Sequence, residues 1–256
     1  MNPILARQLA ADYCCTPEEV QDRENHFTLY RYLEGRRRFQ ENAECRLKIA
    51  VINGKLLFTG AQEMIDWCRN EYAKTGSEWF FEAKNLRRLN DRLHQDGYQI
   101  EMVHPFYIAE QKAGKSAFLG IDPVLASASA KNLEIRWYEK EEIGQFRGDA
   151  RFDEAYAFDK DAPDVLGVSA IRDGQILGMA GASCDSPDLW QIGINVDPQC
   201  REAGIGTLLV TLLKEEVLRR GHLPYYGTSM SHIASQRVAL GAGFRPAWAE
   251  LVTSKL

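Results

Sequence analysis

No run of uncharged apolar residues in this sequence is long enough to span a bilayer, and the first residues lack the apolar core of a signal peptide. The six cysteines include no Cys-x-x-Cys pair and the five histidines show no metal-ligand spacing, which argues against a structural metal site. A net charge of −5 gives no reason to expect general affinity for nucleic acid. We therefore expect a cytoplasmic protein without a membrane segment, a bound metal or a nucleic-acid partner.

The chain is long and apolar enough to bury a substantial core. Its 256 residues, of which 45% are hydrophobic and 26% charged, correspond to one large or two small domains. The second half alternates strand-like and helix-like segments, and Asp173-Gly174 is a strong two-residue hairpin signal. The predicted strands are 133–138, 164–171, 175–183, 190–196, 223–228 and 244–252, the last interrupted by Pro246, and the predicted helices are 139–147, 207–220 and 233–240.

The stretch from Ile192 to Gly206 carries the strongest chemical signal. An apolar strand that ends at Asp197-Pro198 leads into a short loop with Gly204 and Gly206, and a helix with one apolar face opens at Thr207. The free N–H groups of a first helical turn and the helix dipole attract an anion, and glycine lets a phosphate approach the backbone. The pattern indicates a diphosphate site, although glycine between a strand and a helix is also ordinary turn chemistry.

Two landmarks in the right order give this half a family resemblance. Arg201-Glu-Ala-Gly204-Ile-Gly206 matches the motif Arg/Gln-x-x-Gly-x-Gly/Ala, and His232-Ile-Ala-Ser235 followed by Gly243-Phe244 resembles Asn-x-x-Ser/Ala followed by Gly-Phe. Residues 131–256 therefore resemble the GNAT superfamily of acyl-CoA-dependent N-acyltransferases. The resemblance implies an α+β fold with a three-layer α/β/α arrangement and a mixed, splayed central sheet.

The resemblance also implies a cosubstrate and an acceptor. The cosubstrate is acetyl-CoA, whose pantetheine arm fills the gap beside the central strand and pairs with its backbone. The acceptor is a primary amine on a small molecule or a peptide, and a homodimer is left open. The residues implied are Ile194, Asn195 and Val196 for the pantetheine arm, Ala203, Gly204, Ile205, Gly206 and Thr207 for the diphosphate, and Arg201 for added charge.

Two proton-transfer positions of the family hold other residues here. Gln191 stands near the position of a carboxylate base, and Ala239 occupies the position of a tyrosine acid. His232 and Ser235 are the candidate catalytic residues, because histidine titrates near neutral pH and a hydroxyl can protonate a thiolate. Each also has a structural interpretation, since the histidine can cap or pack and the serine can serve the first turn of a helix. The vacant positions keep a rival hypothesis open: a non-catalytic acyl-CoA-binding or regulatory protein.

Two further features bear on the site. By strand alternation, either Tyr225 or Tyr226 must face it, although an aromatic residue in a strand is more often part of the core. Residues 139–164 are rich in Asp and Glu, and an acidic wall there would favour a cationic amine. A solvated helical face explains the same charges.

The first half, residues 1–118, has the pattern of an α/β domain and echoes the second half. Gly60 and Gly206 stand 146 residues apart, as do Gly97 and Gly243. We hypothesise a degenerate GNAT-like repeat, although twenty glycines also permit coincidence. The predicted elements are helices before residue 45, strand 47–52, a turn at Asn53-Gly54, helix 61–74, helix 85–95 and strand 99–103, with Phe58 in the place of Gly204.

One motif points to a different chemistry. Ala109-x-x-x-x-Gly114-Lys115-Ser116 matches a loose P-loop pattern, which needs a buried strand before it and a helix after it. Pro105 interrupts the preceding run and Pro123 arrives early in any following helix, so we interpret residues 109–130 as a connection between the halves.

Overall fold

The structure is a computed structural model that describes residues 1–33, 45–109, 133–200 and 204–256. These residues divide into two compact units. Unit 1 comprises residues 1–106, 228–231 and 246–256, and unit 2 comprises residues 107–227 and 232–245. The domain boundary expected between residues 118 and 131 and the P-loop-like glycine, lysine and serine lie outside the described residues. None of the described helices is both long and apolar enough to cross a membrane.

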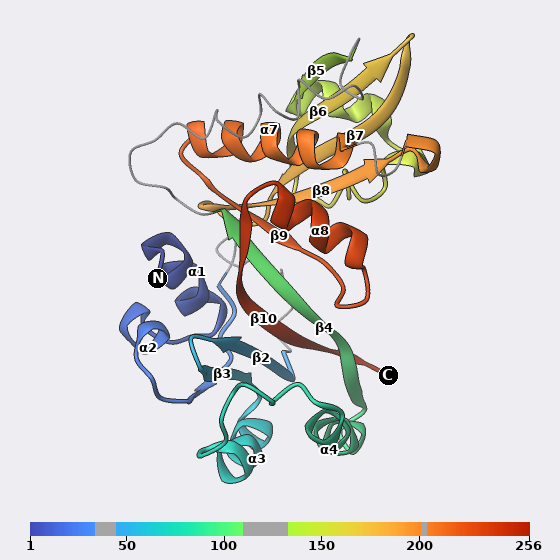
Figure 1. The fold of residues 1–256 in the computed structure, drawn as a ribbon. Coiled ribbons are helices and arrows are strands. Elements are labelled where there is room, and N and C mark those ends of the chain that lie inside the picture. Colours follow the sequence, from blue (N-terminus) through green and yellow to red (C-terminus); the bar gives the residue numbers. More distant parts are fainter. Residues whose placement is uncertain (34–44, 110–132, 201–203) are drawn as a thin grey trace. The chain divides into compact units, whose positions relative to one another are not determined.

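Unit 1 combines strands from both ends of the sequence, in the order β1-β3-β2-β10-β4 (Figure 1). Asn53 and Gly54 join β2 to β3 with φ of 50° and 79°, as a tight hairpin turn of this composition requires, which confirms the predicted turn. The sequence patterns miss β1, which pairs parallel to β3. The elements are α1 (Pro3–Asp12), α2 (Pro17–Gln21), β1 (His26–Leu29), β2 (Leu47–Ile52), β3 (Lys55–Gly60), α3 (Gln62–Tyr72), α4 (Ala83–His94), β4 (Tyr98–Ala109) and β10 (Phe244–Lys255).

An aromatic cluster forms much of the core of unit 1. Phe58 on β3 is fully buried and stacks on Phe27 of β1, with ring centroids 4.6 Å apart. The edge of Phe80 meets the Phe58 ring at 5.7 Å. The position that the proposed repeat equates with Gly204 is therefore a core position of a strand, and no glycine loop exists there.

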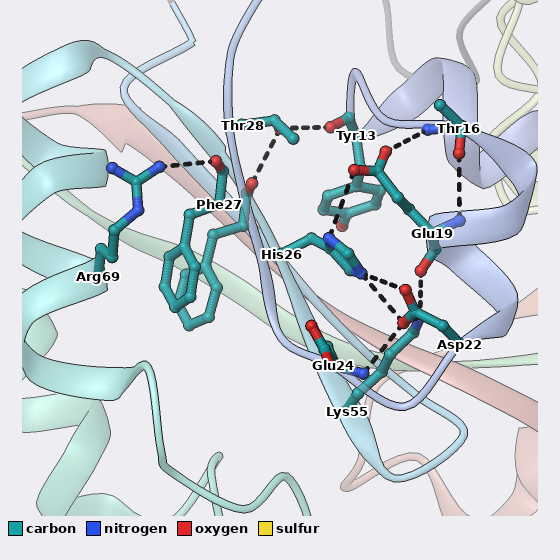
Figure 2. Close-up of polar contacts among 11 residues, drawn as sticks. Tyr13, Thr16, Glu19, Asp22, Glu24, His26, Phe27, Thr28, Lys55 and Arg69 are labelled. Carbon is teal, nitrogen blue, oxygen red and sulfur yellow. Dashed lines mark hydrogen bonds and ion pairs between the residues drawn. The ribbon is translucent and has the colours of Figure 1, made fainter.

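A buried lysine ties α2 to the sheet of unit 1 (Figure 2). The Lys55 side chain on β3 has no exposed surface; its ammonium donates to the Asp22 carboxylate at 2.7 Å and to the main-chain carbonyl of Glu19. The ring of His26 lies 2.8 Å from the same carboxylate. Burial alone would raise the pKa of Asp22, but hydrogen bonds from Lys55, the N–H of Glu24 and His26 hold it well below its usual value.

We expect Asp22→Asn to lower the free energy of unfolding of unit 1 by about 1–2 kcal/mol at neutral pH, because Asp22 is half-exposed and Lys55 keeps one acceptor. A carboxyl with a depressed pKa in the folded protein contributes stability above its unfolded pKa of about 4, and this contribution is lost as the pH falls. Denaturant titrations between pH 3 and 7 should therefore show a shallower acid loss in the variant. An unchanged pH dependence would contradict this assignment.

Unit 2 has the strand order β9-β8-β7-β6-β5. Its pairs are antiparallel except for β8 with β9, which are parallel. The helix α7 contacts β6, β7 and β8, and α6 contacts β5 and β6 (Figure 1). The expected mixed α+β fold is thus confirmed. The elements are β5 (Glu134–Glu139), α6 (Lys140–Ile143), β6 (Asp164–Arg172), β7 (Gln175–Cys184), β8 (Leu189–Val196), α7 (Ile205–Arg219), β9 (Leu223–Gly227) and α8 (Ile233–Gly241).

Several elements differ from the predicted ones. The strand predicted over residues 99–103 is β4, which continues through Pro105 to Ala109, and the helix predicted over residues 139–147 is the four-residue α6 followed by a 3-10 turn. The helix expected to open at Thr207 opens at Ile205, because Gly204 adopts the N-cap position. Pro246 does not interrupt the last strand, which runs from Phe244 to Lys255. The residues of β10 that pair with β2 begin at Ala249, beyond the proline, so the missing N–H costs no bond of that pair.

The repeat hypothesis agrees with part of the element order. Gly97 (φ 77°) and Gly243 (φ 85°) each follow a helix and precede a strand of 12 residues, β4 and β10 respectively. The 146-residue spacing would place the counterpart of β9 at residues 77–81, and these residues form turns. The shared order is therefore helix, helix and strand, without the strand between the helices.

Candidate active site

The sheet of unit 2 opens between its two parallel strands. β8 and β9 pair over three residues only, from Leu189 to Gln191 on β8 and from Leu223 to Tyr225 on β9. On its other edge, β8 pairs with β7 as far as Val196. Both strands lie in the described part of the chain, and residues 192–196 there have no pairing with β9. This is the splay expected of the central sheet, and it leaves a strand edge available to a ligand backbone.

The helix α7 begins next to the end of β8. Its N-cap, Gly204, is exposed, has a left-handed conformation (φ 80°, ψ −1°) and provides no side-chain capping bond. The N–H of Leu208 donates to the Gly204 carbonyl at 3.0 Å, so the N–H groups of residues 204–207 are those that the helix itself does not use. An anion at this position would meet these groups and the positive end of the helix dipole.

Gly204 and Gly206 are required for different reasons. A Cβ on Gly204 would meet nothing within 4 Å, so glycine serves the positive φ. A Cβ on Gly206 would lie 3.3 Å from Val196 and 3.4 Å from Val238, so glycine there lets α7 pack closely against β8 and α8. The sequence suggests one reason for both glycines, the approach of a phosphate. In the structure, Gly204 is needed for its backbone conformation and Gly206 for close packing of the helix.

A row of three glycines crosses the face of the unit 2 sheet that α7 does not cover. Gly167 on β6, Gly181 on β7 and Gly193 on β8 are register partners. A Cβ on any of them would come closer than 3.0 Å to residues 154–156: to the Tyr156 hydroxyl, the Ala155 carbonyl or the Glu154 carbonyl respectively. The row therefore lets residues 154–156 lie directly on the strands, beside the point where β8 and β9 part.

Asn195 fixes the same segment with its side chain. Its Oδ1 accepts hydrogen bonds from the N–H groups of Glu154 (3.0 Å) and Ala155 (2.7 Å), and its Nδ2 donates to Asp153 at 3.0 Å. The resemblance assigns Asn195 through its backbone only. The side chain adds a structural role, because it satisfies two N–H groups of a segment that has no regular secondary structure.

A buried polar cluster marks the last paired position of β8 and β9. The hydroxyl of Tyr225 lies 2.8 Å from Oε1 of Gln191, its register partner, and donates to the Asp185 carboxylate. Ser183 donates to the other oxygen of Asp185. Tyr225 is fully buried and Asp185 is 6% exposed, whereas Gln191 is half-buried.

A second hydroxyl pair occupies the face that α7 covers. Tyr226, on β9, belongs to the core that includes residues of α7, and its hydroxyl lies 2.8 Å from Ser235 Oγ in the first turn of α8. Burial raises the pKa of Tyr226, against a smaller lowering by Ser235, so the phenol stays protonated at neutral pH. Ala239 is fully buried, and His232 is the exposed N-cap of α8 without a side-chain capping bond.

The sequence comparison with known families decides the identity of this region. Residues 131–244 match the model of the acetyltransferase (GNAT) family. This region is a GNAT acetyltransferase domain. The match covers the splayed strands, α7, β9 and α8, and no curated protein matches the chain as a whole or in part.

Solved structures similar to the chain that contains this GNAT domain include several N-acetyltransferases. A GCN5-related N-acetyltransferase-like protein from Streptococcus suis is 14% identical, with 68% of each chain covered and a TM-score of 0.47. An acetyltransferase of the GNAT family from Colwellia psychrerythraea is 13% identical, covers 82% of this chain and 81% of its own, and has a TM-score of 0.43. An aminoglycoside N-acetyltransferase in complex with CoA is 23% identical, covers 45% of this chain and 89% of its own, and has a TM-score of 0.36. Similarities this weak carry no argument about substrate or mechanism.

In the GNAT domain, the structure groups most of the residues singled out in the sequence. Ile194, Asn195 and Val196 lie on the open edge of β8, and Gly204, Ile205, Gly206 and Thr207 form the start of α7. Arg201 and Ala203 lie outside the described residues. The tyrosines of β9 face opposite sides, each with its own polar partner.

The sequence patterns miss Asp185 and the glycine row. Glycine inside a strand signals close approach of another backbone, and three such positions are visible in the sequence. Their alignment depends on the register of β6, β7 and β8, which the sequence does not give. Asp185 carries no signal, because it precedes an ordinary Ser-Pro turn.

Proposed function

We propose that this protein transfers the acetyl group of acetyl-CoA to a primary amine, by direct attack of the amine on the thioester. The observation that supports this most is the opening between β8 and β9 beside the uncapped start of α7. An open strand edge can pair with the amides of a pantetheine arm, and a free helix start can hold a diphosphate. The two features adjoin, as one ligand carrying both groups requires.

Each part of the cosubstrate has candidate partners in this chain. The backbone of Ile194, Asn195 and Val196 would pair with the pantetheine arm, and the N–H groups of residues 203–207 would bind the diphosphate. Arg201 would add charge. Charge-assisted hydrogen bonds of this kind are worth roughly 1.5–3 kcal/mol each, so three or four suffice to hold the cofactor.

Ser235 is the better supported of the two candidate catalytic residues. Its hydroxyl is bonded to the protonated phenol of Tyr226, so Ser235 can give its proton to the leaving thiolate while Tyr226 gives its own to Ser235. The proton that the attacking nitrogen releases to solvent is matched by one that solvent returns to the phenol. Ala239 offers no such group, so this pair would replace the tyrosine that many relatives carry one helical turn later. His232 is exposed at the start of α8 and makes no side-chain capping bond.

The rival proposal, a non-catalytic acyl-CoA-binding protein, is favoured by Gln191 and Ala239, neither of which is an acid or a base. Calorimetry with acetyl-CoA, followed by thiol release assays with a panel of amines, separates the two. Saturable binding with release of CoA supports transfer. Tight binding without release from any amine supports the rival, and no binding of any CoA thioester contradicts both. The cytoplasmic location and a homodimer stay predictions.

A further inference from the structure

At the parting of β8 and β9, the phenol of Tyr225 lies between the carboxylate of Asp185 and the amide of Gln191. Tyr225 has a single O–H proton, and its oxygen lies within hydrogen-bond distance of both Asp185 and Gln191. An ionised carboxylate can only accept, and it is the stronger acceptor. Ser183 and Tyr225 each direct a hydroxyl to a different oxygen of Asp185, so both oxygens accept, as those of an ionised carboxylate do. The phenol proton therefore belongs to Asp185.

The orientation of Gln191 follows from that assignment. If Tyr225 donates its proton to Asp185, the Gln191 atom 2.8 Å from the phenol oxygen must be a donor, so the amide nitrogen of Gln191 faces the phenol. The oxygen and nitrogen of a side-chain amide are assigned from the hydrogen-bond network, and here the network favours exchanging the two. The carbonyl oxygen of Gln191 then faces away from Tyr225, at the residue after which β8 and β9 separate.

The alternation of side chains along β8 shows on which face of the sheet Gln191 lies. Gln191, Gly193 and Asn195 alternate with core residues along β8, and both Gly193 and Asn195 meet residues 153–155. The hydroxyl pair of Ser235 lies on the other face, with α7. Gln191 therefore lies on the face of the sheet opposite the proposed source of the thiolate proton.

We propose that Gln191 binds the attacking amine through its carbonyl oxygen, and that Asp185 and Tyr225 are positioning residues that fix this orientation and favour a cationic amine. This inference rests on the proposed acetyl transfer. The negative charge of Asp185, passed through two hydrogen bonds, makes the Gln191 oxygen a better acceptor for an ammonium group. The bound ammonium gives one proton to solvent, and the free amine that remains attacks the thioester while it is still hydrogen-bonded to Gln191. The carboxylate base that many relatives carry is thus replaced by the neutral amide of Gln191, which is hydrogen-bonded through Tyr225 to the buried carboxylate of Asp185.

Two acceptors of equal size test the proposal. Propylamine is an ammonium ion at neutral pH, and O-ethylhydroxylamine has the same number of heavy atoms and is neutral. We expect Asp185→Asn and Gln191→Leu to raise the KM for propylamine by about tenfold, the loss of one charged hydrogen bond, with less than about a twofold change for O-ethylhydroxylamine. The Kd of acetyl-CoA, measured by calorimetry, should not change.

Tyr138→Phe provides the matched control. Tyr138 is also buried, and its hydroxyl is bonded to one side chain, Ser169, at 3.0 Å, so its removal disturbs the fold of unit 2 comparably. Tyr225→Phe should shift the preference between the two acceptors, and Tyr138→Phe should not. Equal shifts for both acceptors, or a Tyr225→Phe variant that behaves like the control, overturn the inference alone. A native protein that binds acetyl-CoA but acetylates neither acceptor overturns the inference together with the proposed transfer.

Discussion

Replacing Gly204 by valine is expected to raise the Kd of acetyl-CoA by about 100-fold, or roughly 2.7 kcal/mol. The N-cap of α7 has a φ of 80°, where a residue with a Cβ is strained by about 1–2 kcal/mol and a β-branched one by more. The turn relieves this strain by changing its path, which moves the free N–H groups of residues 204–207 away from the diphosphate. Calorimetry on the folded variant measures the loss.

Gly221 supplies a control on the same helix. It follows the other end of α7, has a φ of 88° and, like Gly204, has nothing within 4 Å of the place of a Cβ. Gly221→Val therefore introduces the same backbone strain far from the free N–H groups, and should lose stability without losing affinity for acetyl-CoA. Equal losses of affinity in the two variants would show that the effect of Gly204 is general destabilisation. Unchanged affinity in Gly204→Val would remove the helix start from the site.

Gly181→Ala should destabilise unit 2 by about 3 kcal/mol or release residues 154–156 from the sheet. The added methyl group would overlap the main-chain carbonyl of Ala155 and press on the ring of Tyr156. The first is backbone and the second is a buried ring, so neither can readily move aside. Hydrogen exchange should report faster exchange at the N–H groups of Glu154 and Ala155, which Asn195 holds in the native protein.

Gly178→Ala is the comparison on the same strand. A Cβ there would meet the side-chain methyl groups of Ile205 and Leu209 at 3.1 Å, which can yield, and the main-chain carbonyl of Asn195 at 3.2 Å, which a shift of a few tenths of an ångström relieves. We expect a loss of about 1 kcal/mol or less and unchanged exchange at Glu154 and Ala155. If Gly181→Ala exchanged as slowly as Gly178→Ala, residues 154–156 would not depend on the glycine row.

Local patterns in the sequence predict much of unit 2. Asp173-Gly174 predicts its hairpin, because both residues tolerate positive φ (51° and 78°). The strand before Asp197-Pro198 and the helix after Gly204 occur as expected, since each depends on neighbours within a few residues. The start of α7 was two residues off, because glycine at an N-cap leaves no side-chain signal.

Contacts between distant segments could not be predicted in the same way. β1 has only four residues, too few for a clear alternating pattern, and it is a strand because it pairs with β3, about thirty residues later. The partners of Tyr225 come from the end of β7 and from β8, so the cluster exists only once three strands are in register. The splay was implied by the family resemblance, and no residue pattern alone dictates where the pairing of β8 and β9 stops.

The placement of residues 246–256 within unit 1 has a consequence for biosynthesis. β2 lies between β3 and β10, so one edge of β2 is unpaired until the residues of β10 have been translated. The sheet of the amino-terminal unit therefore cannot be completed on the ribosome until the acetyltransferase domain has also been translated. Residues 1–118 expressed alone would leave one edge of β2 unpaired and prone to aggregation, and residues 131–256 expressed alone would contain β10 without β2. Neither fragment is therefore expected to replace the whole chain.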